Sequence, residues 1–528
     1  MPVAVITLKT DYWETFKIKE SDLEFLYNHL LELETPQTSQ ELVKALVENR
    51  IDHEKAALSQ QHNPSGKMYV PKDHYQVGEK LVFPSLEMKS GKVISVRTGS
   101  NPDLPPFEVI EVAMHDHSTH LFASGIEDHV MNNPITIDTD DPNLNVDAVL
   151  KAHGQDLIKK LSDVFTKNSD LVCIAGKWFP RALLVDVNIG YLNLAEAVLD
   201  VSEGGPLTTE ELLKQIELPT DVNSKLTEFS MDLYLQEDSR FDEVGPAGKT
   251  LWFLKRAEPA EVREKPDFLK YDPIEVDGSE IQQMLRTLSP ETYDELETCD
   301  VLDDEIEETT ISLIYPHWQS GTLPLTVPLK KLFPTAYETP RIRFTFVDGQ
   351  TGKMFPGWVV RPNKYVYGLQ NWYKTQGLIP GSLVHIRRGE QPGEMIVSTE
   401  KCRSSREWIR TVLVGADGGL VFATLKQVVT SAFDERMAIA ITHPENLEKM
   451  WHSPNHLKAP LSKVVLNTMR ELSKLNPQGQ IHAQELYAAV NLVRRCPPTP
   501  ILHLLVNNSW ANYLGDSYFR LDDTGQEG

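Results

Sequence analysis

The chain has 528 residues, a formal net charge of −24, 41% hydrophobic residues and 24% charged residues. At roughly 150 residues per domain, this length predicts several folded domains, each able to bury its own core. The 34 Pro and 29 Gly are too few and too scattered for a fibrous or low-complexity chain. The four cysteines form no C-x-x-C pair, which argues against a disulfide framework and against a thiolate zinc site.

The N-terminus lacks the basic segment and apolar core of a secretory signal. No uncharged apolar run reaches the ~18 residues that a membrane helix needs. Together with the sparse cysteines, these features predict a cytoplasmic protein without a membrane partner. We expect an α+β fold of several domains.

The N-terminal part predicts two modules of different kinds. In residues 1–66, apolar residues at helical spacing and a polar turn predict a helix-turn-helix-like domain. Residues 20–61 carry 9 acidic and 3 basic side chains, a net charge of −6, which favours packing or protein contact over phosphate binding. In residues 67–135 the apolar residues alternate with period two between turns, which predicts a small antiparallel β-barrel.

Two later segments share one helical plan. Residues 146–257 predict a leading helix at 146–165, three further helices and a two-stranded hairpin that ends in Trp252, Phe253 and Leu254. Residues 460–523 repeat three helices and a closing hairpin, with Tyr518 and Phe519 in the last strand. Both segments resemble the winged-helix modules called HARE-HTH, which occur in the delta subunit of bacterial RNA polymerase and in chromatin proteins. The resemblance implies winged-helix folds.

Charge is unevenly distributed along the chain. Residues 258–310 carry 18 acidic and 4 basic side chains, a net charge of −14, whereas residues 340–412 carry 12 basic and 5 acidic side chains, a net charge of +7. We expect the acidic segment to be a solvated linker. The alternative is a segment that competes with nucleic acid for the basic module. Weaker DNA binding by the full chain than by residues 335–415 would favour the alternative.

The basic module, within a predicted domain at 311–430, alternates apolar and polar residues along short strands around one helix. Gly368 to Trp372 at a helix start, followed by Leu378 to Ser382 before a strand, resembles the DNA-binding pseudobarrel of plant auxin-response and abscisic-acid-response transcription factors. Some restriction endonucleases share that domain. Ser382 stands where the family has aspartate. The resemblance implies that strand-end arms enter the major groove of double-stranded DNA.

The candidate DNA contacts are basic or amide side chains of this module. Arginine and lysine neutralise phosphates, arginine can pair with guanine, and asparagine can pair with adenine. Trp358, Trp372 and Tyr373 are expected in the core rather than stacked on bases. The resemblance points to Arg361, Asn363 and Lys364, with Arg387 and Arg388 as further candidates, and charge adds Arg341, Arg343 and Lys374, with Arg403, Arg406 and Arg410 extending the surface. The alternative is a solvated face or a dock for an acidic partner.

Motifs of enzymes and metal sites are weak in this sequence. No G-x-S-x-G, H-E-x-x-H or G-x-G-x-x-G string occurs, and the segment 245–250 lacks the first glycine of a phosphate loop. His115, His117 and His120 could face one way on a strand and bind zinc, although a polar hairpin tip explains them without metal. We therefore expect no enzyme, no cofactor and no metal.

The sequence thus predicts a non-enzymatic DNA-binding protein that acts in transcriptional regulation or in recruitment to DNA. The alternative is a protein-interaction scaffold whose acidic winged helices bind a basic partner such as RNA polymerase; residues 191–256 carry a net charge of −7. A nuclease with an unrecognised site is a third possibility. Salt-sensitive DNA binding, co-purification with protein alone and metal-dependent cleavage separate the three.

Overall fold

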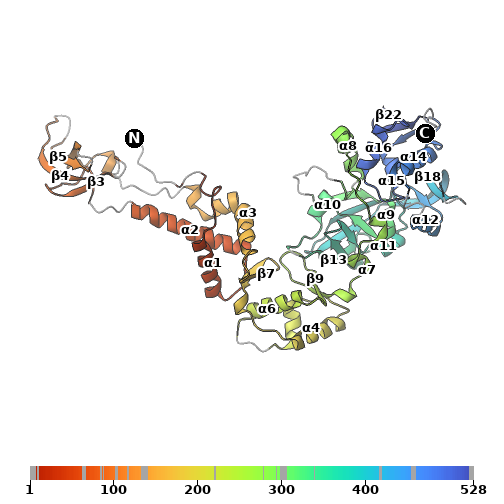
Figure 1. The fold of residues 1–528 in the computed structure, drawn as a ribbon, viewed down its shortest axis with the longest axis horizontal. Coiled ribbons are helices and arrows are strands. Elements are labelled where there is room, and N and C mark those ends of the chain that lie inside the picture. The colour runs from red at the N-terminus through yellow and green to blue at the C-terminus, as the bar shows by residue number, and fades with distance from the viewer. Residues whose placement is uncertain are drawn as a thin grey trace. The chain divides into compact units, whose positions relative to one another are not determined.

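The computed structural model is a mixed α+β protein with several separate sheets (Figure 1). It describes residue 8 and residues 11–61, 67–83, 86, 89–101, 105–115, 118–132, 141–218, 222–276, 279–292, 294–297, 306–337, 339–415, 419–453 and 459–522. The chain divides into two compact units, residues 1–185 with 221–229, and residues 186–220 with 230–528. The predicted α+β class is confirmed.

The first unit contains a three-helix bundle closed by a small sheet. Thr38 and Glu41 cap the second helix reciprocally, since each side chain binds the other residue's backbone N–H. In the sheet, Gln37 and Thr38 pair with Trp178 and Lys177. The elements are α1 (Glu20–Leu33), β1 (Gln37–Thr38), α2 (Ser39–Gln61), α3 (Val146–Phe165), β7 (Leu171–Ile174) and β8 (Lys177–Pro180), with strand order β1-β8-β7.

This pairing corrects one predicted assignment. The helix expected at 146–165 is present as α3, but the sequence placed it at the head of the 146–257 domain. The structure instead puts α3, β7 and β8 in one unit with α1 and α2. The Trp178 indole N–H donates to Ser39 Oγ at 2.9 Å, and its ring packs edge-on against Phe165. The N-terminal module is therefore larger than residues 1–66, and a second module is inserted within it.

The inserted module is a five-stranded sheet. Its strands β3 to β6 pair antiparallel in chain order, as predicted, while β2 runs parallel to β3. The Tyr69 hydroxyl donates to the carbonyl of Ala123 at 2.5 Å, and Ser124 Oγ donates to the carbonyl of Asp73 at 2.8 Å, so the 69–75 loop joins the first strand to the last. The strands are β2 (Lys67–Met68), β3 (Lys80–Phe83), β4 (Lys89–Thr98), β5 (Glu108–Met114) and β6 (Thr119–Ser124).

Residues 189–254 form another three-helix bundle and hairpin. Thr208 and Glu211 form a capping box at the start of α5, and the buried Trp252 indole N–H donates to Asp232 Oδ1 at 2.9 Å. Leu207, just before α5, forms an antiparallel β-bridge with Trp252. The segment that leads into α5 therefore lies beside β10. The elements are α4 (Ile189–Val201), α5 (Thr209–Ile216), α6 (Ser224–Glu237), β9 (Phe241–Glu243) and β10 (Trp252–Leu254).

A seven-stranded sheet follows, with one parallel contact, between β13 and β17. Alternate residues of β13 are buried, which fits the period-two pattern predicted from the sequence. The order is β11-β16-β17-β13-β14-β15-β12. The elements are β11 (Glu308–Ser312), α9 (Tyr315–Ser320), β12 (Thr322–Pro324), α10 (Val327–Leu332), β13 (Arg341–Asp348), β14 (Met354–Val360), β15 (Tyr365–Tyr367), α11 (Gln370–Gln376), β16 (Leu383–Arg388) and β17 (Glu394–Ser398).

The rest of the predicted 311–430 domain forms a separate sheet. Two long antiparallel strands make a ribbon, and a short third strand joins only at Thr411 and Val412. Among the residues that the structure describes, the ribbon is followed by one helix and by the C-terminal bundle. The elements are β18 (Lys401–Val414), β19 (Leu420–Ser431), β20 (Ala440–Ile441), α12 (Pro444–Trp451), α14 (Leu461–Ser473), β21 (Gln480–His482), α15 (Ala483–Val490), α16 (Pro498–Asn507), β22 (Ala511–Gly515) and β23 (Tyr518–Leu521).

The three bundles share one order of elements. In each, a helix leads into a short extended segment, two helices follow, and a hairpin closes the chain. The extended segment pairs with the last strand of the hairpin, giving the orders β1-β8-β7, Leu207-β10-β9 and β21-β23-β22. The sequence predicted the three helices and the closing hairpin of this plan twice, and the described residues contain the full plan three times.

Candidate functional site

Two of the predicted DNA contacts are engaged inside the protein. Arg341 Nη1 lies 2.6 Å from Asp242 Oδ2 and 3.4 Å from Glu258 Oε2. Arg343 places its guanidinium 5.4 Å from the ring centroid of Phe253 and 5.9 Å from that of Trp358. Burial lowers the pKa of Arg343. Both side chains hold the β9–β10 hairpin against the seven-stranded sheet, so they are removed from the candidate DNA surface.

The other predicted contacts lie nearer the surface. Arg361, Lys374, Arg387 and Arg388 are exposed, whereas Asn363 and Lys364 are half-buried. Arg361 donates to the carbonyl of Thr339 at 2.9 Å, and Arg388 donates to the carbonyls of Lys331 and Leu332. Lys364 has a positive φ of 56°, and its carbonyl accepts from the backbone N–H of Leu325. The four exposed cations, Arg361, Lys374, Arg387 and Arg388, remain available to a ligand.

The sheet register separates the four exposed cations. Arg361 follows β14 where Val360 pairs with Arg341, at the start of β13. Arg387 pairs with Ile396, which pairs with Val347 near the end of β13. Six residues of strand separate the two ends, about 20 Å at ~3.3 Å per residue. The cations therefore line a surface and do not gather in one compact site.

The basic character of this region survives the internal pairing. Between residues 340 and 412, the acidic side chains Glu390, Glu400 and Glu407 are exposed among the described residues. The exposed basic side chains in the same described stretch are Lys353, Arg361, Lys374, Arg387, Arg388, Lys401 and Arg406. The side chain of Arg403 falls outside the described residues. Trp358, Trp372 and Tyr373 are buried, as expected for core residues.

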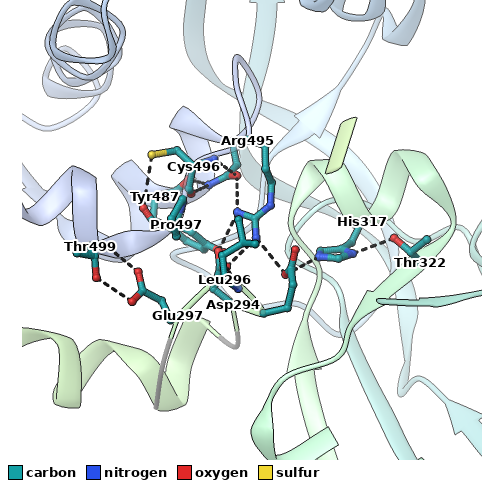
Figure 2. Close-up of polar contacts among 12 residues, drawn as sticks. Asp294, Leu296, Glu297, His317, Thr322, Tyr487, Arg495, Cys496, Pro497 and Thr499 are labelled. Carbon is teal, nitrogen blue, oxygen red and sulfur yellow. Dashed lines mark hydrogen bonds and ion pairs between the residues drawn. The ribbon is translucent and has the colours of Figure 1, made fainter. Parts of the chain in front are cut away.

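A buried cluster of charged residues, which the sequence did not predict, joins three segments of the second unit (Figure 2). Arg495, which follows α15, donates from Nη1 to Asp294 Oδ2 at 2.8 Å and from Nη2 to Asp294 Oδ1 at 2.7 Å. The same Nη2 lies 3.0 Å from Glu295 Oε2. His317 Nε2 lies 3.0 Å from that carboxylate oxygen. We call Asp294, Glu295, His317 and Arg495 the buried junction.

Further hydrogen bonds fix Asp294, His317 and Arg495 in the buried junction. The Tyr487 hydroxyl donates to Asp294 Oδ2 at 2.7 Å, and Asn491 Oδ1 accepts from Arg495 Nη1 at 3.2 Å. His317 Nδ1 lies 2.8 Å from the Thr322 hydroxyl. Nearby, the backbone N–H and the hydroxyl of Thr499 both donate to the carboxylate of Glu297 at 2.7 Å. The acidic segment, α9 and the C-terminal bundle are thereby held together.

Burial and charge explain the ionisation of the buried junction. Its four side chains are at most 4% exposed. Burial alone would raise the pKa of Glu295, but Arg495 and His317 together hold that pKa well below its ordinary value. A bidentate arginine–carboxylate pair of this kind is strong because it is desolvated and charge-assisted. With their hydrogen bonds directed at one another, the four residues serve to hold the fold together.

The junction corrects the prediction that the whole acidic segment is a solvated linker. Glu258, Asp294 and Glu295 are buried, and the segment forms the helices α7 (Ala260–Arg263) and α8 (Gln282–Thr292). Ile281 and Leu288 enter the same apolar core as α14 to α16. The physical reason is that this acidic segment also contains a few apolar residues that enter the core and two carboxylates that pair with the buried Arg495.

A second enclosed group of charges lies beside the β9–β10 hairpin. Burial raises the pKa of Glu243 to about 7. Burial, followed by the hydrogen bond and the charge of Asp242, raises the pKa of Glu258 to about 8, against a smaller lowering by Arg341. Both carboxyl groups are therefore protonated over part of the neutral range.

In the described ranges, no three His, Cys, Asp or Glu side chains lie close enough to hold a metal ion. His115 and His120 belong to these ranges, while His117 lies outside them. Of the helices described, none combines the length and apolarity needed to cross a bilayer.

Comparison with protein-family models, with curated proteins and with solved structures found no match to this chain.

Proposed function

We propose that this chain is a non-enzymatic DNA-binding protein acting in transcriptional regulation or recruitment, and that the exposed cations of the seven-stranded sheet carry the duplex contact surface. The observation that supports the proposal most directly is the excess of exposed cations over exposed acids between residues 340 and 412. In a chain with a net charge of −24, such a local excess directs a polyanion to one region.

The three bundles support the same proposal through their order of elements. As the sequence resemblances imply, we take the second and third bundles to be winged-helix units and the seven-stranded sheet to be a pseudobarrel, and from their shared order of elements we extend the winged-helix assignment to the first bundle. In the second bundle the hairpin is occupied by the sheet: the backbone N–H of Arg343 donates to the carbonyl of Val244 at 2.8 Å, and Phe253 packs edge-on against Trp358. That hairpin is thus an internal contact rather than a DNA-binding wing.

The occupied hairpin also favours a second candidate function, a protein-interaction scaffold. It is a winged-helix-like element used for protein contact, and residues 191–256 carry a net charge of −7. The acidic bundles would then bind a basic partner such as RNA polymerase, since residues 20–61 of the first bundle also carry a net charge of −6. Size-exclusion chromatography of the full chain with purified polymerase tests this directly, since co-elution without DNA supports the scaffold.

The test of DNA binding uses the full chain and a labelled 20-base-pair random duplex at two salt concentrations. The double variant Arg361→Gln/Arg387→Gln should bind more weakly, with the slope of log affinity against log salt reduced by about 0.9 for each lost phosphate contact. The matched control, Lys151→Gln/Lys167→Gln, removes two exposed charges from α3 and its end. Equal loss in both double variants, or absence of binding at low salt, would refute the proposal.

A further inference from the structure

The β18–β19 ribbon changes its surroundings along its length. Directly opposite residues of the pair share one face, so Arg406 lies beside Val428, Trp408 beside Lys426 and Arg410 beside Thr424. Farther along this same face, Val412 and Phe422 are buried in the core of the C-terminal bundle. The face therefore leaves the protein interior as it runs from Val412 back toward Arg406.

The exposed end of that face carries a basic and aromatic patch. Trp408 is 66% exposed and Val428 is 60% exposed, and Arg406 and Lys426 are exposed beside them. Lys426 Nζ lies 5.1 Å from the centroid of the Trp408 ring. In the described part of the chain, neither Arg406 nor Lys426 forms an ion pair. We call Arg406, Trp408, Lys426 and Val428 the ribbon patch.

The ribbon does not need Trp408 for its own packing. On the opposite face, Ile409 and Val429 are buried against Ala438 and Ala440. Arg410, at the inner border of the patch, is held by Glu485 Oε1 at 2.9 Å and by the carbonyl of Arg436 at 2.8 Å. Trp408 is therefore left in solvent, beside Val428 and between residues that the fold holds in place.

The outer border of the patch connects it to the seven-stranded sheet. Thr430, two residues beyond Val428 on the same face, donates from its hydroxyl to the carbonyl of Gln376 at 3.5 Å. Gln376 ends α11, on which Lys374 is exposed. The cations of the patch therefore continue toward a cation that the sequence assigned to DNA contact.

We propose that the ribbon patch binds single-stranded nucleic acid, with an unpaired base stacked on Trp408 and neighbouring phosphates on Arg406 and Lys426. Stacking on an exposed ring requires the flat face of a base, which stacking between neighbouring base pairs hides in a duplex and an unstacked single strand offers. The two cations flank the ring on adjacent strands, and the face from 406 to 410 and from 424 to 428 carries no acidic residue. The complementary charge therefore favours a phosphate backbone.

This inference goes beyond duplex binding by the seven-stranded sheet. The full chain would engage paired DNA on one surface and an unpaired strand on the neighbouring ribbon. The two functions can fail separately, because the Arg361→Gln/Arg387→Gln variant and the ribbon variants alter different residues.

The experiment is a fluorescence-anisotropy titration of the full chain with labelled 12-nucleotide oligothymidylate, alongside the 20-base-pair duplex. Trp408→Ala should weaken oligothymidylate binding by about 5- to 150-fold, the range found when one stacking aromatic is removed, and should leave duplex affinity nearly unchanged. Trp408→Phe should retain part of the affinity. Tyr513→Ala, which removes another exposed aromatic side chain, is the matched control and should bind normally.

Three outcomes would overturn the proposal: no oligothymidylate binding by the native chain, equal binding by Trp408→Ala and the control, or a loss confined to the duplex. A 12-residue oligoglutamate probe separates stacking from charge. Binding of this peptide that depends on Trp408, without oligothymidylate binding, would assign the patch to an acidic protein partner instead.

Discussion

The buried junction and the ribbon patch use similar charges in opposite ways. Arg495 lies in the interior with two carboxylates within hydrogen-bonding distance, whereas Lys426 lies on an exposed strand beside a mostly exposed Trp408. In the interior, desolvation makes each unpaired charge very costly, so every partner is supplied by the chain itself. On the ribbon, solvent stabilises the charges and leaves them available. The number of charged residues in a segment therefore does not distinguish a buried junction from an exposed patch.

The largest expected effect comes from breaking the buried junction. Arg495→Met leaves Asp294 and Glu295 without their cation and should lower the free energy of unfolding of the full chain by about 3–5 kcal/mol. Urea denaturation followed by circular dichroism measures the loss. Arg520→Met, at an exposed position of β23, should change the value by less than about 0.5 kcal/mol.

A triple variant sharpens this result. Asp294→Asn/Glu295→Gln/Arg495→Met removes all three charges and should recover much of the stability lost in Arg495→Met, because no unpaired ion remains. A triple variant as unstable as the single one would mean that shape, and not charge, accounts for the loss.

The stability of the chain should depend on pH through Glu258, beside the docked hairpin. Glu258 has its pKa raised from 4.5 to about 8, so the folded state binds more protons than the unfolded state between these values. Its stabilising contribution is fully present below about pH 4.5 and is lost as the pH rises through 8. For one such group the slope reaches about 1.4 kcal/mol per pH unit.

Glu258→Gln removes this titration. As the pH rises from 5 to 9, the native chain should therefore lose more stability than the variant does. Urea midpoints measured at each pH test the shift. The control Glu264→Gln, at an exposed position nearby, should run parallel to the native chain. A parallel curve for Glu258→Gln would contradict the prediction.

The smallest effect is expected on the ribbon patch. Trp408→Ala and Lys426→Ala should each change the free energy of unfolding by less than about 0.5 kcal/mol, because both side chains are exposed. Ile409→Ala, one residue away on the buried face, should cost about 2–5 kcal/mol. A large loss of stability in Trp408→Ala would make the tryptophan a folding residue and weaken its assignment to binding.

The sequence predicted elements better than their assembly. The helix at 146–165 and the hairpin that ends in Trp252, Phe253 and Leu254 were expected from local periodicity, and both are present. The assignment of the helix to a later domain was wrong because the deciding strand, β1, is only two residues long. A strand so short has no alternation to detect, and its partner Trp178 lies far along the chain.

The candidate site shows a similar limit. Composition identified a basic region, but it could not separate Arg341 and Arg343, which are engaged by the β9–β10 hairpin, from Arg361 and Arg387, which are exposed. Likewise, Asp294 and Arg495 are 201 residues apart and meet only in the folded chain. The Trp408 patch had a detectable signal, an aromatic residue between Arg406 and Arg410, but its exposure depends on where the ribbon leaves the core.

The insertion of the β2–β6 sheet between α2 and α3 has a consequence for the order of folding. The short strand β1 can pair with β8 only after the intervening chain, with its own sheet, has been synthesised. Closing such a long loop costs entropy that grows slowly with length, about 0.6 kcal/mol for each doubling, but it slows the search for the native contact. An inserted sheet that folds early brings the ends of α2 and α3 into a shorter effective loop. Early folding of the inserted module would therefore speed closure of the bundle that surrounds it.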